Sequence, residues 1–240
     1  MAFGDWDSFT FASAGTVTAA LNVSDPIVGS GSLTQGQNTD ASVNASVTTH
    51  LDSGFNRGLT KGRIRSIVRM DGNWVESAAF IDEIGFGIYY MSNNFDINNN
   101  TSDFYWAGMA RPRNSAGELQ AVIARSPNKV LHLLDWNPFA STDELINSHT
   151  PITGVVEGDT LPIQIEWNLD ISGLGGMRHT MSIGNIGDTN FSNLTQIYDF
   201  VEAGPLTTSS IEGLGWTHQS TLNTANNGVS WDSTGVFQLV

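Results

Sequence analysis

Arginine is concentrated in one short stretch of the chain. Between Gly62 and Met70, alternate positions carry Arg63, Arg65 and Arg69, which are three of the eight arginines. The positions between them carry mostly apolar residues. Alternate side chains of a β-strand point to opposite faces of the sheet, so this stretch predicts a strand whose one face bears the densest positive charge of the chain.

A second stretch, Leu161–Asp170, alternates without a break. Its apolar positions are Leu161, Ile163, Ile165, Trp167 and Leu169, and its other positions include Gln164, Glu166, Asn168 and Asp170. This pattern predicts a strand with one face in the core and one face in water. Gly158-Asp159 precedes it as a turn, and Ser172–Gly176 ends it.

If these two strands share a sheet, a binding face results. Its candidate residues, for a glycan or for another subunit, are Arg63, Arg65, Arg69, Glu166, Asp170 and Arg178. The alternative is cross-strand charge pairing on a solvated or subunit-facing sheet. We favour charge pairing, because no exposed aromatic side chain can be assigned to that face from the sequence.

Other chemically interesting residues give weaker signals. The five histidines lie on separate segments without metal-ligand spacing, and no serine nucleophile elbow, P-loop or dinucleotide fingerprint occurs. We therefore predict no catalytic residue, no metal site and no cofactor. The Asp96–Asp103 loop is rich in oxygen ligands, but an Asx-rich turn is favoured over a calcium site.

Seven tryptophans are many for a chain of this length. Trp167 shares the apolar face of its strand, so we expect it in the core. Trp106, Trp136 and Trp216 are candidates for stacking on a sugar or at an interface, although core packing is the favoured interpretation for each.

About a dozen short strand patterns follow one another along the chain, which predicts a β-sandwich or barrel. Phe104–Ala110 and Glu118–Arg125 are expected to form a hairpin, and Gly85 and Gly87 to bulge or bend their strand. The one helix candidate is a capped turn at Ser141–Leu145. We predict a single domain over residues 1–240, with a loop-rich insert around 29–60.

Composition excludes several classes of function. The 240-residue chain has no cysteine, 24 acidic and 10 basic residues, and a net charge of −14. Disulfides and thiolate metal sites are therefore excluded, and such a charge repels nucleic acid. No segment approaches the roughly 20 apolar residues of a membrane helix, and the first residues do not resemble a signal peptide.

The order of these features resembles the jelly roll of the concanavalin A-like lectin/glucanase superfamily, which includes laminin-G-like domains. The matching stretches are Ile84–Tyr90, Phe104–Trp106, Gly158–Asp170, Met177–Gly184 and Gly228–Asp232. The resemblance implies a two-sheet antiparallel β-sandwich. It also implies that the strand at Gly158–Asp170 pairs with the strand at Met177–Gly184, and that the terminal strand lies beside the first strand of the chain. It also implies glycan binding on polar rows of the concave sheet. The Glu-x-Asp-x-(x)-Glu motif of the glucanases is incomplete at Asp82-Glu83.

Three hypotheses for function follow. The first is a non-enzymatic virion structural protein, such as a capsid decoration or tail-surface protein of a tailed phage. Its partners would be other virion proteins, further copies of itself in a homo-oligomer, and in one variant a host-surface glycan, but neither nucleic acid nor membrane. The first alternative is a carbohydrate-binding module or lectin. The second is a diverged glycoside hydrolase using Asp82 or Glu83 with Glu166.

Overall fold

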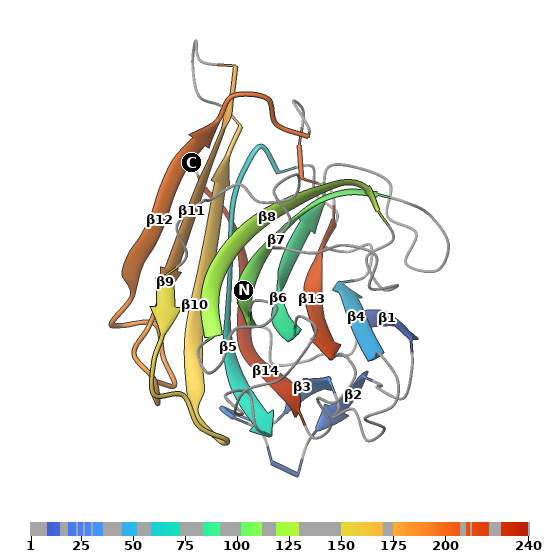
Figure 1. Cartoon of the computed structure of the whole chain (residues 1–240), viewed down its shortest axis with the longest axis vertical. Coiled ribbons are helices and arrows are strands. Elements are labelled where there is room, and N and C mark those ends of the chain that lie inside the picture. The colour runs from blue at the N-terminus through green and yellow to red at the C-terminus, as the bar shows by residue number, and fades with distance from the viewer. Residues whose placement is uncertain are drawn as a thin grey trace.

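The computed structural model describes residues 9–14, 19–22, 24–25, 27–29, 31–35, 45–51, 59–72, 84–91, 102–111, 119–129, 150–169, 175–206, 210–211, 213–220 and 227–239. All regular structure in these ranges is β-strand. The strands form two seven-stranded antiparallel sheets that lie on one another as two layers (Figure 1). None of the described segments forms a helix long and apolar enough to cross a membrane.

The first sheet, called here the β7 sheet, has the strand order β1-β4-β13-β6-β7-β8-β9. These strands are β1 (Phe9–Ala14), β4 (Ala45–Leu51), β13 (Gly213–Ser220), β6 (Ile84–Met91), β7 (Ser102–Arg111), β8 (Leu119–Lys129) and β9 (Thr150–Ile152). The pairing of β7 with β8 confirms the predicted hairpin.

The second sheet, the β5 sheet, has the order β12-β11-β10-β5-β14-β3-β2. Its strands are β12 (Thr195–Glu202), β11 (Met177–Ile183), β10 (Thr160–Asn168), β5 (Lys61–Gly72), β14 (Asn227–Gln238), β3 (Ser32–Gln35) and β2 (Ala19–Asn22). β5 and β10 are neighbours, which was the condition for a shared binding face, and β10 pairs with β11 as predicted.

The core lies between the two sheets and uses the alternation seen in the sequence. Ile64, Val68 and Met70 of β5 are fully buried, as are Ile163 and Ile165 of β10. Each such side chain stabilises the fold by roughly 1.5–3 kcal/mol relative to exposure.

Indole N–H groups in this core all find acceptors, as buried polar groups must. Trp167 donates to the Leu59 carbonyl at 3.1 Å, and Trp216 donates to Ser66 Oγ at 3.0 Å. Trp167 is 1% exposed, which confirms its predicted place in the core. A Cβ on Gly62 would lie 2.1 Å from the Trp167 ring, so this tight packing requires a glycine on the neighbouring strand.

Two predictions about the strands are wrong. β6 pairs with β7 without a shift of register, so the bulge predicted at Gly85 and Gly87 is wrong, while the bend given as its alternative stays a prediction. A Cβ on Gly87 would lie 2.5 Å from the Trp106 ring, and glycine provides that space. The terminal strand β14 does not lie beside β1. It pairs with β3 and with β5, a strand of equal length, while β1 belongs to the other sheet.

The region around 29–60 was predicted to be rich in loops. Two strands lie within it, β3 in the β5 sheet and β4 in the β7 sheet. The helical turn predicted at Ser141–Leu145 falls outside the described residues.

Candidate functional site

The predicted binding residues lie on the outer surface of the β5 sheet. We call this surface the arginine face and define it by Arg63, Arg65, Arg69, Glu166 and Arg178. Glu166 lies opposite Arg63 in the pairing of β10 with β5, and Arg178 follows on β11. All five side chains are partly or fully exposed. The sixth predicted residue, Asp170, lies outside the described residues.

Most charges on the arginine face are neutralised in pairs. Glu166 Oε1 accepts from Arg63 Nε at 2.7 Å and lies 2.6 Å from Arg63 Nη2. Arg178 makes a forked contact with Asp199 on β12, at 2.6 and 2.5 Å. This is the charge pairing that the sequence favoured, and Asp199 is a partner that the sequence analysis missed.

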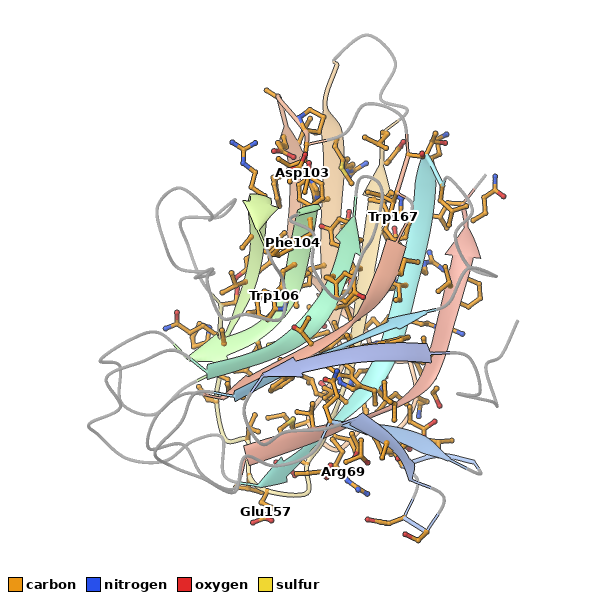
Figure 2. All side chains as sticks on the ribbon, turned by 90° about the vertical axis from the view of Figure 1, so that its right-hand side faces the viewer. Arg69, Asp103, Phe104, Trp106, Glu157 and Trp167 are labelled. Carbon is orange, nitrogen blue, oxygen red and sulfur yellow. The ribbon has the colours of Figure 1, made fainter. Side chains whose placement is uncertain are left out.

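Arg69 is paired at the far end of the same face. It contacts Asp71 at 2.7 Å and Asp25 at 3.0 Å. Burial lowers the pKa of Arg69, but the hydrogen bonds and charges of these two carboxylates outweigh burial and raise it. Arg69 and Trp167 mark opposite ends of the β5–β10 strand pair (Figure 2).

Arg65 differs from these arginines. Its guanidinium carbon lies 4.5 Å from the ring centre of Phe191 and 4.8 Å from that of Phe237. Its Nε is buried and has no hydrogen-bond partner. Burial, followed by the charge of Arg63, lowers the pKa of Arg65. The group is therefore a partly desolvated cation in contact with two aromatic rings, with hydrogen-bonding capacity that the described residues do not use.

The two rings reach Arg65 from segments far apart in the chain. Phe191 belongs to the turn between β11 and β12, which is tied to β10 where Gly187 N donates to the Thr160 carbonyl at 2.8 Å. Phe237 is on β14, opposite Arg63. Gly235 lies opposite Arg65, and a Cβ there would lie 2.6 Å from the Phe237 ring, so this glycine opens the space for the ring.

Two acceptor groups lie next to the clamped arginine. Gln164 is paired with Arg65 across β10 and β5, and its Nε2 donates to Glu166 Oε1 at 3.0 Å. Among the described residues, none donates to the other oxygen of Glu166 or to the side-chain oxygen of Gln164. We call Arg65, Gln164, Glu166, Phe191 and Phe237 the Arg65 site.

A second aromatic group lies on the outer surface of the β7 sheet. It consists of Tyr89, Phe104 and Trp106, with Phe104 and Trp106 both on β7 (Figure 2). Trp106 is only 2% exposed, and its indole N–H donates to Thr217 Oγ1 at 2.8 Å. These rings are buried, so they offer no open platform for a sugar.

Trp216 was also a candidate for stacking, and the structure places it in the core at 0% exposure. Trp136, the acidic pair Asp82-Glu83 and most of the Asp96–Asp103 loop lie outside the described residues. Within the described ranges, His, Asp and Glu side chains do not gather in threes at distances that suit a metal ion.

A buried polar cluster joins the two sheets. Glu202 on β12 accepts from Tyr105 Oη at 2.7 Å and from Arg125 Nη1 at 2.5 Å, and lies 3.3 Å from His179 Nε2. Tyr90 Oη lies 2.8 Å from His179 Nδ1. A carboxylate can only accept, so Nε2 of His179 carries the proton and Tyr90 donates to Nδ1.

The cluster has well-defined protonation. Burial lowers the pKa of His179 despite the hydrogen bond to Glu202, so the imidazole is neutral. Burial alone would raise the pKa of Glu202, but hydrogen bonds from His179 and Tyr105 outweigh it and hold that pKa below its ordinary range. Both side chains are at most 7% exposed. The cluster is therefore a structural link between the sheets, and both ring nitrogens of His179 are satisfied within it.

Comparison with known proteins supports the fold. No protein-family model matches the chain, and no curated protein matches its sequence. Among solved structures, the calcium- and Man3GlcNAc-bound exoplasmic/lumenal domain of VIP36 is similar, with a TM-score of 0.59 and 10% identity over 100% of this chain and 87% of that one.

Two further structures have the same fold. The PL-14 alginate lyase from Aplysia kurodai has a TM-score of 0.56 and 9% identity, covering 98% of this chain and 92% of its own. A legume lectin-like domain from Entamoeba histolytica has a TM-score of 0.50 and 9% identity, covering 96% and 90%. The predicted fold, a two-sheet antiparallel jelly roll of the concanavalin A-like type, is thereby confirmed.

Proposed function

We propose that this protein binds carbohydrate on the arginine face, at the Arg65 site. One observation carries the proposal: unused hydrogen-bonding groups of both kinds lie beside two aromatic rings. The donor is the guanidinium of Arg65, and the acceptors are the open oxygens of Gln164 and Glu166. Phe191 and Phe237 supply the rings.

Sugars have the complementary chemistry. Each hydroxyl both donates and accepts, so a sugar is held best where donors and acceptors stand side by side. The C–H surface of the ring packs on aromatic side chains, and a small number of placed polar groups then fixes its orientation. The side chains of the Arg65 site come from four different segments but are held by β-strands and by a tied turn, which favours a preformed site.

The fold comparisons support the same function. The VIP36 domain is described as bound to Man3GlcNAc, and the Entamoeba domain as legume lectin-like. The alginate lyase shows that this fold also carries catalysis on a polysaccharide. The prediction that the chain is not an enzyme therefore stays a prediction. Within the proposed site Glu166 is already bound by Arg63.

The predicted role as a virion structural protein also stays a prediction, as do its homo-oligomeric state, its virion partners and its location in a virus particle. The fold neighbours are lectin-type domains and a lyase. They favour a glycan as the partner.

A glycan array with matched variants tests the proposal. The intact chain should bind a restricted set of glycans, and Arg65→Ala should weaken that binding by about 10-fold or more, since a hydrogen bond to a charged group contributes about 1.5–3 kcal/mol. Lys61→Ala is the control, because it removes a positive charge from the same strand outside the Arg65 site. Failure to bind any glycan, or equal loss in both variants, would reject glycan binding at this site.

A further inference from the structure

The charge of the Arg65 site restricts the class of sugar that it can take, and this inference rests on the proposed function. We propose that the site selects sugars that carry a carboxylate, that is uronic-acid residues, and that the carboxylate binds the guanidinium of Arg65 while sugar hydroxyls bind Gln164 and Glu166.

Arg65 lacks the counter-charge that its neighbours have. The arginines Arg63, Arg69, Arg125 and Arg178 each lie within 3.0 Å of a carboxylate oxygen. Among the arginines whose side chains the structure describes, Arg65 alone has no carboxylate partner. Two phenylalanine rings lower the free-energy cost of burying Arg65 but do not neutralise its charge. A carboxylate from a ligand would complete the same kind of pair that the other four already make.

The geometry leaves the terminal end of the guanidinium for that ligand. Nε is enclosed and unpartnered, whereas the two terminal nitrogens are not among the enclosed unpartnered atoms and make no hydrogen bond to the described residues. The guanidinium carbon lies 4.5 Å from the ring centre of Phe191 and 4.8 Å from that of Phe237, and these contacts restrict its movement. A planar fork matches a carboxylate, which accepts two parallel hydrogen bonds from it.

Neighbouring acceptors distinguish a sugar acid from other anions. The open oxygen of Glu166 is negatively charged, and the protein carries a net charge of −14. An anion without hydroxyl groups offers no donor for Glu166, and a dense polyanion is repelled by the whole chain. A uronic acid brings one carboxylate for Arg65 and hydroxyl donors next to it for Gln164 and Glu166.

Isothermal titration with matched ligands tests this inference. The ligands are oligosaccharides of galacturonate, glucuronate, mannuronate and guluronate. Each is compared with its carboxyl-reduced counterpart of the same linkage and length. A neutral oligosaccharide that carries sulfate groups is the anion control. For at least one uronate, the intact chain should bind about 10-fold or more tightly than its reduced form. Arg65→Gln should abolish that preference, and Lys61→Gln, which removes a positive charge from the same strand outside the Arg65 site, should retain it.

The outcomes separate the two proposals. Preference for a uronate that depends on Arg65 supports both. Equal binding of a uronate and its reduced form, or tighter binding of the sulfated control, overturns the carboxylate inference but leaves glycan binding standing. If the glycan array and the titrations both show no binding, the proposed function fails and the inference fails with it. Arg65→Lys adds a folded variant that keeps the charge but lacks the fork, and it should lose most of the preference.

Discussion

Glu202 provides a direct test of how the two sheets are held together. The proposed perturbation is Glu202→Gln, which keeps the shape of the side chain but removes its charge. The carboxylate is 6% exposed and receives hydrogen bonds from Tyr105, Arg125 and His179. An amide can accept at one atom only, so its NH2 group would face one of these donors. Arg125 has a second acceptor, the Gly204 carbonyl at 3.1 Å, so the loss falls mainly on Tyr105 and His179.

The magnitude follows from those three contacts. A hydrogen bond to a charged group contributes about 1.5–3 kcal/mol, and a buried donor left without an acceptor costs about 1–3 kcal/mol. The contact to Arg125 contributes less than this range, because that side chain is 36% exposed and water can replace the carboxylate. Since the amide retains one acceptor, we expect a total loss of about 2–4 kcal/mol in the free energy of unfolding.

Urea denaturation of Glu202→Gln and of a matched control measures this loss. The control is Glu157→Gln, the same change at an exposed turn at one end of the sandwich (Figure 2), which should shift the free energy of unfolding by less than about 0.5 kcal/mol. Equal slopes with a lower midpoint for Glu202→Gln would identify a change in stability. Midpoints that agree for the two variants would refute the role given to the cluster.

Two further predictions concern acid sensitivity and glycine packing. The pKa values of His179 and Glu202 are both lowered in the folded state, so the unfolded chain binds more protons. The stability of the fold should therefore be complete above about pH 6.5, and it should fall as the pH drops through the folded pKa of His179. Urea midpoints measured from pH 8 to pH 5 should show this fall, and a midpoint independent of pH would contradict it. At Gly108 a Cβ would lie 2.2 Å from the Phe86 carbonyl oxygen, so Gly108→Ala should lower the free energy of unfolding by at least about 1–3 kcal/mol. Gly204→Ala, where a Cβ meets nothing within 4 Å, should change it by less than about 0.5 kcal/mol, and similar melting temperatures for the two variants would contradict the packing argument.

The sequence predicts the strands well, because one face of each is buried. Alternation in β5 and β10 places Arg63, Arg65 and Glu166 on one side without any knowledge of the fold. It does not show which strands are neighbours in the sheet. From the sequence, the contact of Glu166 with Arg63 was therefore conditional on β5 and β10 being neighbours, and the structure shows that they are.

The Arg65 clamp could not be predicted in this way. Phe191 is in a turn, where side chains do not alternate. Phe237 reaches Arg65 on the neighbouring strand only because Gly235 has no side chain. The sequence analysis had discounted a binding face for lack of an aromatic side chain on it, and these two rings are the ones that it missed. A glycine followed two residues later by phenylalanine near the end of a strand was the available signal.

The buried cluster was missed for a related reason. Glu202 is the last residue of β12, and its partners come from both sheets. Contacts of this kind depend on how two sheets face each other, and periodicity along one strand contains no information about that.

The central claim is that Arg65 holds the ligand, and the Nε–Hε resonance of that side chain tests it most directly. Assigned through its loss in Arg65→Lys, this resonance should shift progressively when the best-binding glycan of the array is titrated into the ¹⁵N-labelled protein. The Nε–Hε resonance of Arg125, which is already bound to Glu202, should stay in place. A bound glycan that leaves the Arg65 resonance unmoved would contradict the account.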